Sequence, residues 1–182
     1  SRLRHVGGRG ERGAGPGLYI MCGTTGLFMC HMSGLRWCTA GKQQVRSASM
    51  CWPCACVELY GMRPSDWWPF SQSLCNDRRI AAVIDWMRRP TEIRPRLVTL
   101  YFDTVDTAGH FFGPAPSPKL NAAIADVDKN IGVLVRNLAD LDQPANIVIV
   151  SDHGMPETSP HRIIYLDQIL TRDQYRLITG GN

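Results

Sequence analysis

Two short polar segments carry residue types that can bind a metal ion. Asp106 and His110 lie four residues apart in a glycine-containing stretch, and Asp152 and His153 are adjacent and precede a glycine. Carboxylate and neutral imidazole are common zinc ligands, and a catalytic zinc site keeps one position open for water or substrate. The four side chains are therefore candidate ligands of a dication, either in one site or in two.

Each of these pairs directly follows an apolar, β-prone run. Residues 97–102 precede the first pair, residues 146–150 precede the second, and a long amphipathic segment separates the two runs. This order is typical of a strand–helix–strand unit, in which the strands are parallel and the crossover is right-handed. Parallel strands end at a common edge of the sheet, where α/β proteins bind ligands. We therefore expect the two pairs to lie beside each other in loops at that edge.

A turn is needed after the second run if Asp152 and His153 are to bind the same ion. Adjacent side chains of an extended strand point to opposite faces, so without a turn the two would serve different ions. Gly154 permits the turn, because glycine adopts backbone angles that other residues avoid. From the residues alone, both alternatives remain open.

A first helix is expected between residue 76 and Pro90. Its apolar side chains recur at helical spacing, and Asn76 and Asp77 are the expected caps. The arginines of this segment, Arg79 among them, are expected to face outward. A short loop then leads to the run at 97–102, which makes this a helix–strand connection of the α/β type.

The amphipathic segment between the two runs is expected to form a longer helix that covers one face of the sheet. Ser117 is the predicted N-cap, Pro118 the first residue, and the helix should reach about Leu141. Its predicted buried stripe is Leu120, Ile124, Val127, Ile131, Leu134 and Leu138. The pattern predicts an α/β fold with helices packed on a mostly parallel sheet.

Several motifs resemble those of a known family. Leu-Tyr-Phe at 100–102, Val-Asp-x-x-Gly-His-x-x-Gly-Pro at 105–114 and Ser-Asp-His-Gly-Met at 151–155 resemble the nucleotide pyrophosphatase/phosphodiesterases of the alkaline phosphatase superfamily, the bacterial members most closely. The likeness covers about residues 41–170. It implies an alkaline-phosphatase-like fold and hydrolysis of nucleotide phosphodiester or pyrophosphate bonds, which releases nucleoside 5′-monophosphates.

The resemblance also implies a role for each donor pair. Asp106 and His110 match two ligands of one zinc ion, and Asp152 and His153 match two ligands of a second, so a complete site holds two Zn²⁺. The resemblance further implies a hydrolysis mechanism in which a threonine is the nucleophile.

Two aromatic residues match positions that line the nucleotide pocket of the family, Tyr101 and Phe70. An aromatic side chain at a strand end is otherwise most often part of the core. As pocket residues they favour a nucleotide substrate over the alternatives within the superfamily, a phosphomonoesterase or a phosphonate hydrolase.

Other parts of the family's site have no match here. The family needs a threonine nucleophile, a further aspartate from an upstream strand and a downstream histidine, and none of these is recognisable, so the nucleophile is unknown. Each zinc ion would then have two protein ligands, too few for a tight catalytic site. The alternative to an active phosphodiesterase is therefore an inactive fragment or degenerate copy that binds metal weakly, and we expect the chain alone to be inactive.

Composition adds broad limits. The 182 residues are 44% hydrophobic and 20% charged, which is typical of one globular domain or a piece of a larger one. Residues 1–40 are expected to be irregular without a family match, and residues 41–182 to be a partial phosphodiesterase catalytic domain. We expect no nucleic-acid partner from a net charge of +4, no membrane span and no signal peptide; the resemblance implies a periplasmic or secreted protein.

Overall fold

A five-stranded parallel sheet forms the centre of the molecule. The computed structural model describes residues 17–22 (backbone only), 37, 39–52, 55–58, 61–172 and 174. The strands run in the order β3-β2-β4-β1-β5, and every neighbouring pair is parallel. They are β1 (Gly17–Cys22), β2 (Ser47–Met50), β3 (Asp66–Trp68), β4 (Leu97–Phe102) and β5 (Asn146–Ser151).

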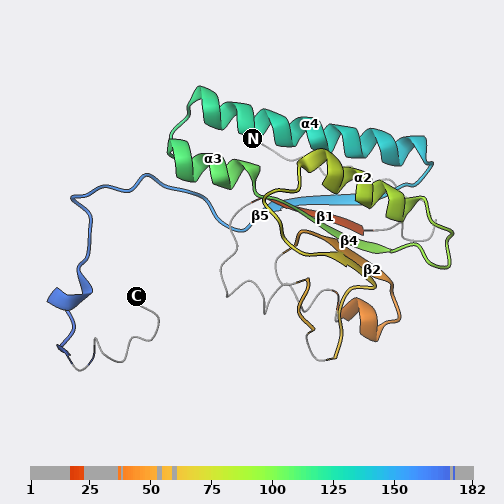
Figure 1. Ribbon diagram of the computed structural model, residues 1–182, viewed down its shortest axis with the longest axis horizontal. Helices are drawn as coiled ribbons and strands as arrows, with labels where there is room; N and C mark the ends of the chain where they lie inside the picture. The colour runs from red at the N-terminus through yellow and green to blue at the C-terminus, as the bar shows by residue number, and fades with distance from the viewer. Residues whose placement is uncertain are drawn as a thin grey trace, which may run out of the picture.

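Three helices lie together on one side of this sheet (Figure 1). They are α2 (Asn76–Met87), α3 (Thr104–Phe112) and α4 (Pro118–Asp140), and a 3₁₀ turn, η1, covers Leu166–Gln168. The long α4 packs against both α2 and α3. The expectation of an α/β fold with helices on a parallel sheet is confirmed.

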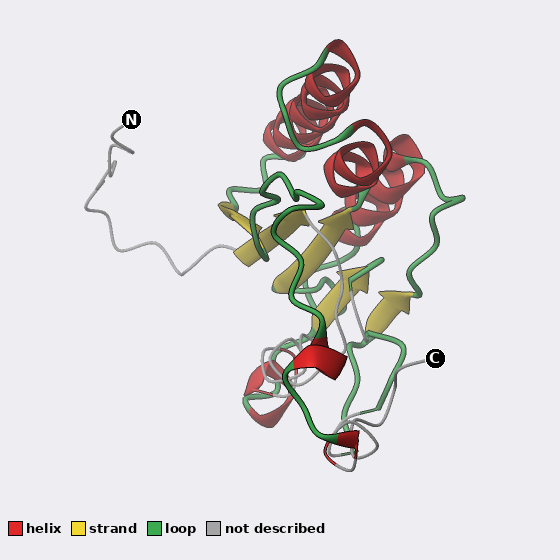
Figure 2. Ribbon diagram, turned by 90° about the vertical axis from the view of Figure 1, so that its left-hand side faces the viewer, coloured by secondary structure: helices red, strands yellow, loops and turns green. Residues whose placement is uncertain are grey.

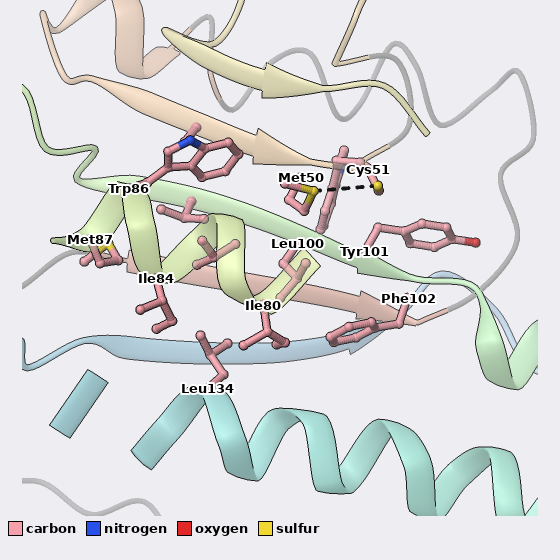
Figure 3. Close-up of a cluster of buried hydrophobic side chains, with 14 of the residues drawn as sticks. Met50, Cys51, Ile80, Ile84, Trp86, Met87, Leu100, Tyr101, Phe102 and Leu134 are labelled. Atoms are coloured by element: carbon pink, nitrogen blue, oxygen red, sulfur yellow. Dashed lines mark hydrogen bonds between the residues drawn. The ribbon is translucent and has the colours of Figure 1, made fainter. Parts of the chain in front are cut away.

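The core lies between β4 and the helices. Leu100 and Phe102 of β4 are fully buried, with Ile80 and Ile84 of α2 and Leu134 of α4 around them (Figure 3). Full burial of one such side chain contributes about 1.5–3 kcal/mol. Side chains alternate along a strand, so Tyr101 points to the opposite face of the sheet from its two neighbours. Because β4 is buried, the position of the segment that follows Phe102 is well defined.

Helix α4 follows the sequence closely. Ser117 caps it by accepting a hydrogen bond from the Leu120 backbone N–H at 3.2 Å, and Pro118 is its first residue, as predicted. Val127, Leu134 and Leu138 of the expected stripe are buried, as is Leu120, and Ile131 is partly buried. Ile124 is the exception, because its side chain is 49% exposed and lines a pocket beside α3 instead of the core.

Helix α2 departs from the expectation at its start and on one face. Its N-cap is Cys75, with no side-chain capping bond, so Asn76 and Asp77 belong to the first turn. Arg79 does not face outward: it is 1% exposed. The reason is a set of acceptors that its guanidinium contacts: a carbonyl and a carboxylate at the end of β4, and two carbonyls of the segment before α2.

Strand β1 corrects two expectations at once. Residues 17–22 fall in the region expected to be irregular, yet they pair with β4 on one side and β5 on the other. The strands β4 and β5 are therefore not adjacent. Glycines before and after this short run hide it in the sequence, because no hydrophobic period extends beyond it. The rest of the region, 1–16 and 23–36, lies outside the described residues.

Strand β5 is an edge strand, and most of its side chains are exposed. After Ser151 the chain runs away from the sheet and the helices toward η1 (Figures 1 and 2). Among the helices that the structure describes, none is long and apolar enough to cross a membrane.

Candidate metal centre

Asp106 and His110 lie on a helix, not in the loop that the glycines indicated. Helix α3 begins directly after Asp103, whose carbonyl accepts the Thr107 amide at 2.9 Å, and it ends before Gly113, which has a φ of 84°. Residues four apart in a helix share a face. The helix therefore brings the two donors to the same side without any turn between them.

The first pair has a buried carboxylate and an exposed imidazole. The Asp106 side chain is 9% exposed and that of His110 is 63% exposed, and Asp106 Oδ1 lies 3.6 Å from His110 Nε2. Asp106 Oδ1 is buried and has no hydrogen-bond partner. A buried charged oxygen without a partner is costly, so this atom is suited to a cation.

The second pair has the same arrangement. The Asp152 side chain is 2% exposed and that of His153 is 46% exposed, with Asp152 Oδ2 3.6 Å from His153 Nε2. Asp152 Oδ2 is again buried without a hydrogen-bond partner. The other oxygen, Oδ1, accepts the His153 backbone N–H at 3.1 Å. The chain thus turns after β5, and adjacent side chains meet on one side.

A backbone bond orients the second imidazole. His153 Nδ1 lies 2.8 Å from the Gly154 carbonyl oxygen, which can only accept, so Nδ1 carries the hydrogen. In the neutral ring Nε2, which lies 3.6 Å from Asp152 Oδ2, is then the nitrogen without a hydrogen. Zinc-binding histidines are held by such a bond from the second ring nitrogen.

Both pairs fit a zinc ion. Oxygen and nitrogen ligands about 2 Å from a tetrahedral ion lie about 3.3 Å apart, close to the 3.6 Å in each pair. Each pair also provides one carboxylate oxygen and one imidazole nitrogen, which zinc prefers. Among the described residues, no group of three or more His, Cys, Asp or Glu could hold one ion. The donors therefore come as two pairs, and each leaves coordination positions for other ligands.

One member of each pair, Asp106 and His153, lines the same pocket although β1 separates their strands. A cavity of about 230 Å³ is lined by Asp106 from α3 and by Ser151 and His153 from the end of β5. Gly109, between the two donors of α3, packs closely on Met155: a Cβ added there would lie 2.7 Å from the methionine sulfur. A side chain at residue 109 would require Met155 or α3 to shift, so glycine permits this approach.

The electrostatics of the pocket agree with this placement. Burial raises the pKa of Asp152 above its ordinary value, His153 lowers it, and the charge of Asp106 raises it further. The two carboxylates therefore repel each other across the pocket. A dication bound between or beside them would remove that repulsion.

The aromatic pair lies next to these carboxylates. Phe70 and Tyr101 form an edge-to-face contact, with ring centroids 5.6 Å apart and planes at 64°. Tyr101 is buried and Phe70 is exposed. Burial raises the pKa of Tyr101 far above its usual value, and the charges of Asp103, Asp106 and Asp152 raise it further. The phenol therefore stays protonated, and Phe70 presents part of its ring to solvent.

Sequence reasoning missed three residues of this region. Arg79 was taken for a surface arginine, and its position among other arginines gives no signal to the contrary. Gly109 was taken for a loop glycine, whereas it is a packing position in a helix. Met155 is its partner, and only its place at the end of the Ser-Asp-His-Gly-Met motif could have pointed to it.

Comparisons with known proteins give the family of the chain. The family model described as type I phosphodiesterase / nucleotide pyrophosphatase matches residues 32–182. The chain is 36% identical over 136 residues to ectonucleotide pyrophosphatase/phosphodiesterase family member 1 of Mus musculus, covering 74% of this chain and 15% of the relative. It is 40% identical over 137 residues to an uncharacterized pyrophosphatase/phosphodiesterase of Schizosaccharomyces pombe, covering 73% and 28%.

A solved structure gives the same relationship. Murine ectonucleotide pyrophosphatase/phosphodiesterase 5, an inactive threonine-to-alanine variant in complex with AMP, matches with a TM-score of 0.66 at 31% identity, over 75% of this chain and 36% of that chain. The described chain thus spans about a third of that structure and less of the curated relatives. The matched region includes both donor pairs, since the family model extends through residue 182. The chain belongs to the type I phosphodiesterase/nucleotide pyrophosphatase family.

Proposed function

We propose that this chain is part of a zinc-dependent hydrolase that cleaves phosphodiester or pyrophosphate bonds of nucleotides and releases nucleoside 5′-monophosphates. Asp106 with His110 and Asp152 with His153 would each bind one of two zinc ions. The observation that carries the proposal is the pair of buried carboxylate oxygens without hydrogen-bond partners, each 3.6 Å from an imidazole Nε2. Asp106 of one pair and His153 of the other line the same pocket.

Each side chain has a definite task in this proposal. The two carboxylates and two imidazoles hold the ions, and bound zinc would supply positive charge for the phosphoryl oxygens and a lowered pKa for a hydroxyl nucleophile. Phe70 would stack on the nucleobase with its exposed ring, and Tyr101 would hold Phe70 in place through the edge-to-face contact of the two rings. That the murine relative was solved with AMP supports a nucleotide as the substrate class.

The nucleophile is the open part of the proposal. We propose a threonine, supported by the inactivity of the threonine-to-alanine variant of the murine relative. No threonine lines the pocket of Asp106 and His153 among the described residues. We therefore expect the chain alone to hydrolyse the p-nitrophenyl ester of thymidine 5′-monophosphate only at background rate.

The alternative function is a weak metal-binding module without turnover, derived from the enzyme. It is favoured by the number of ligands, because the described residues offer two donors for each ion and no group of three. A chimera distinguishes the two: residues 47–155 replace the matching segment of the active murine relative. The proposal predicts zinc-dependent hydrolysis by the chimera and loss of most of it in Asp106→Ala and His153→Ala, while Asp128→Ala on the exposed face of α4 has no effect. A chimera that folds and binds AMP, yet is inactive with zinc, would support the alternative.

A further inference from the structure

Arg79 is a buried charge outside the proposed metal ligands. Its side chain is 1% exposed, and its guanidinium forms an ion pair with Asp103 at 2.8 Å. It also donates to the carbonyl oxygens of Tyr101 at 3.0 Å, Leu74 at 2.9 Å and Ser71 at 3.0 Å. All three guanidinium nitrogens therefore have partners, which satisfies a group that would otherwise be costly to bury.

These partners belong to the segments that build the proposed site. Asp103 is the N-cap of α3, the helix that carries Asp106 and His110. The Tyr101 carbonyl is in β4, directly before that cap. Ser71 follows Phe70, the ring that packs on Tyr101. One guanidinium thus connects the start of the metal-binding helix, the strand before it and the segment that presents the aromatic ring.

We propose that Arg79 is a positioning residue that sets the orientation of α3, and with it the Asp106/His110 pair, relative to β4 and Phe70. The inference rests on the proposed function for its zinc ligands. It does not require that the ion pair stabilise the fold, because buried ion pairs are often neutral in stability compared with apolar replacements. The ion pair instead fixes the orientation of the start of α3, because the planar guanidinium donates its hydrogen bonds in fixed directions and the ammonium of Lys does not.

The test variant is Arg79→Lys, which keeps the charge but cannot reach four acceptors in these directions. Its matched control is Arg88→Lys, at the C-cap of the same helix but exposed and paired with Asp85 at 3.4 Å. The first readout needs no metal: hydrogen exchange of the Thr107 amide, which is bonded to Asp103 in α3, against the Asn121 amide, which is bonded to Ser117 in α4. We expect faster exchange of Thr107 in Arg79→Lys, unchanged exchange of Asn121, and no change at either amide in Arg88→Lys.

The second readout separates the two metal pairs by zinc titration. In a His153→Ala background the remaining zinc affinity reports Asp106 and His110, and in a His110→Ala background it reports Asp152 and His153. We expect Arg79→Lys to lower the affinity of the α3 pair about tenfold and to leave the β5 pair unchanged. If Arg79→Lys fails to fold, Asp103→Asn replaces it, because it removes the charge of the pair while keeping an oxygen that accepts.

Two results would overturn the inference. One is an unchanged exchange rate of the Thr107 amide in Arg79→Lys. The other is exchange that accelerates equally at Thr107 and Asn121, together with an equal loss of zinc affinity at both pairs, which would make Arg79 a general stabiliser of the fold. Failure of the proposed function is a different result: the unsubstituted chain would then bind no zinc that depends on His110 or His153. In that case the exchange readout still decides whether Arg79 orients α3.

Discussion

At the scale of single residues, the candidate site is built from carboxylates that are more buried than the imidazoles beside them. Residue type and spacing were enough to select these four side chains as candidate ligands, because few other side chains serve a zinc ion. Burial was not predictable in the same way. Arg79 is buried where exposure was expected, and Ile124 is exposed where burial was expected, since the burial of a helix side chain depends on what the neighbouring strand and helix present to it.

The burial of Asp152 leads to a prediction about the metal-free chain. Asp152→Asn removes a buried charge, keeps the oxygen that accepts the His153 amide, and places an N–H₂ where it can donate to His153 Nε2. At about pH 8 we expect the free energy of unfolding without metal to rise by about 1–2 kcal/mol. Urea denaturation measures it.

The same substitution should abolish any rise in stability that zinc gives through this pair, because an amide is a poor replacement for an anionic ligand. Asp128→Asn, on the exposed face of α4, is the control and should change neither quantity. A metal-free Asp152→Asn variant that is less stable than the parent would show that the carboxylate already has a partner.

A second residue-scale prediction concerns the contact of Gly109 with Met155. Gly109→Ala improves helix propensity by about 1 kcal/mol, but its Cβ would lie 2.7 Å from the Met155 sulfur. We expect the two effects to offset each other, so that Gly109→Ala alone changes the unfolding free energy little. In a Met155→Ala background the same change should stabilise by about 1 kcal/mol. Equal effects in both backgrounds would mean that α3 and Met155 do not touch.

At the scale of elements, predictions succeeded where a segment carries its own boundaries. Ser117 and Pro118 predict the start of α4, and the apolar runs predict β4 and β5. Two elements were missed. Helix α3 has glycine and aromatic residues in place of strong helix formers, so its form depends on packing against α4. Strand β1 is a short run among glycines, and only its two partner strands make it a strand.

The C-terminus of α4 gives the prediction at this scale. Asp142 has a φ of 49° and its amide donates to the Ala139 carbonyl at 2.9 Å, while the Gln143 amide donates to Leu138 at 3.0 Å. This is the Schellman arrangement, in which glycine is the favoured residue at the left-handed position. Asp142→Gly should therefore stabilise the chain by about 1 kcal/mol, because it relieves the left-handed strain and removes a negative charge from the helix C-terminus.

Asp142→Ala is the matched control, since it removes the charge and retains the strain. Thermal and urea unfolding of both variants separate the two contributions. If Asp142→Ala stabilises as much as Asp142→Gly, the charge and not the backbone conformation accounts for the gain.

At the scale of the whole molecule, the sheet order determines how the site is assembled. With β1 between β4 and β5, the ends of those two strands lie about 10 Å apart, two strand spacings. A sequence pattern gives the strands but not the order, because pairing depends on backbone contacts between distant segments. Asp106 and His153 still line a common pocket, because α3 extends from β4 toward the loop after β5 and packs there through Gly109.

The central claim is that the two Asp/His pairs are zinc ligands, and the most direct test is the imidazole signals of the chain in a zinc titration followed by NMR. His110 and His153 should shift or broaden, whereas His161, which is exposed and belongs to neither pair, should not. Magnesium, which prefers oxygen ligands, should leave all three signals in place. Signals of His110 and His153 that stay unchanged with zinc, or a His161 signal that changes as much as theirs, would contradict the account.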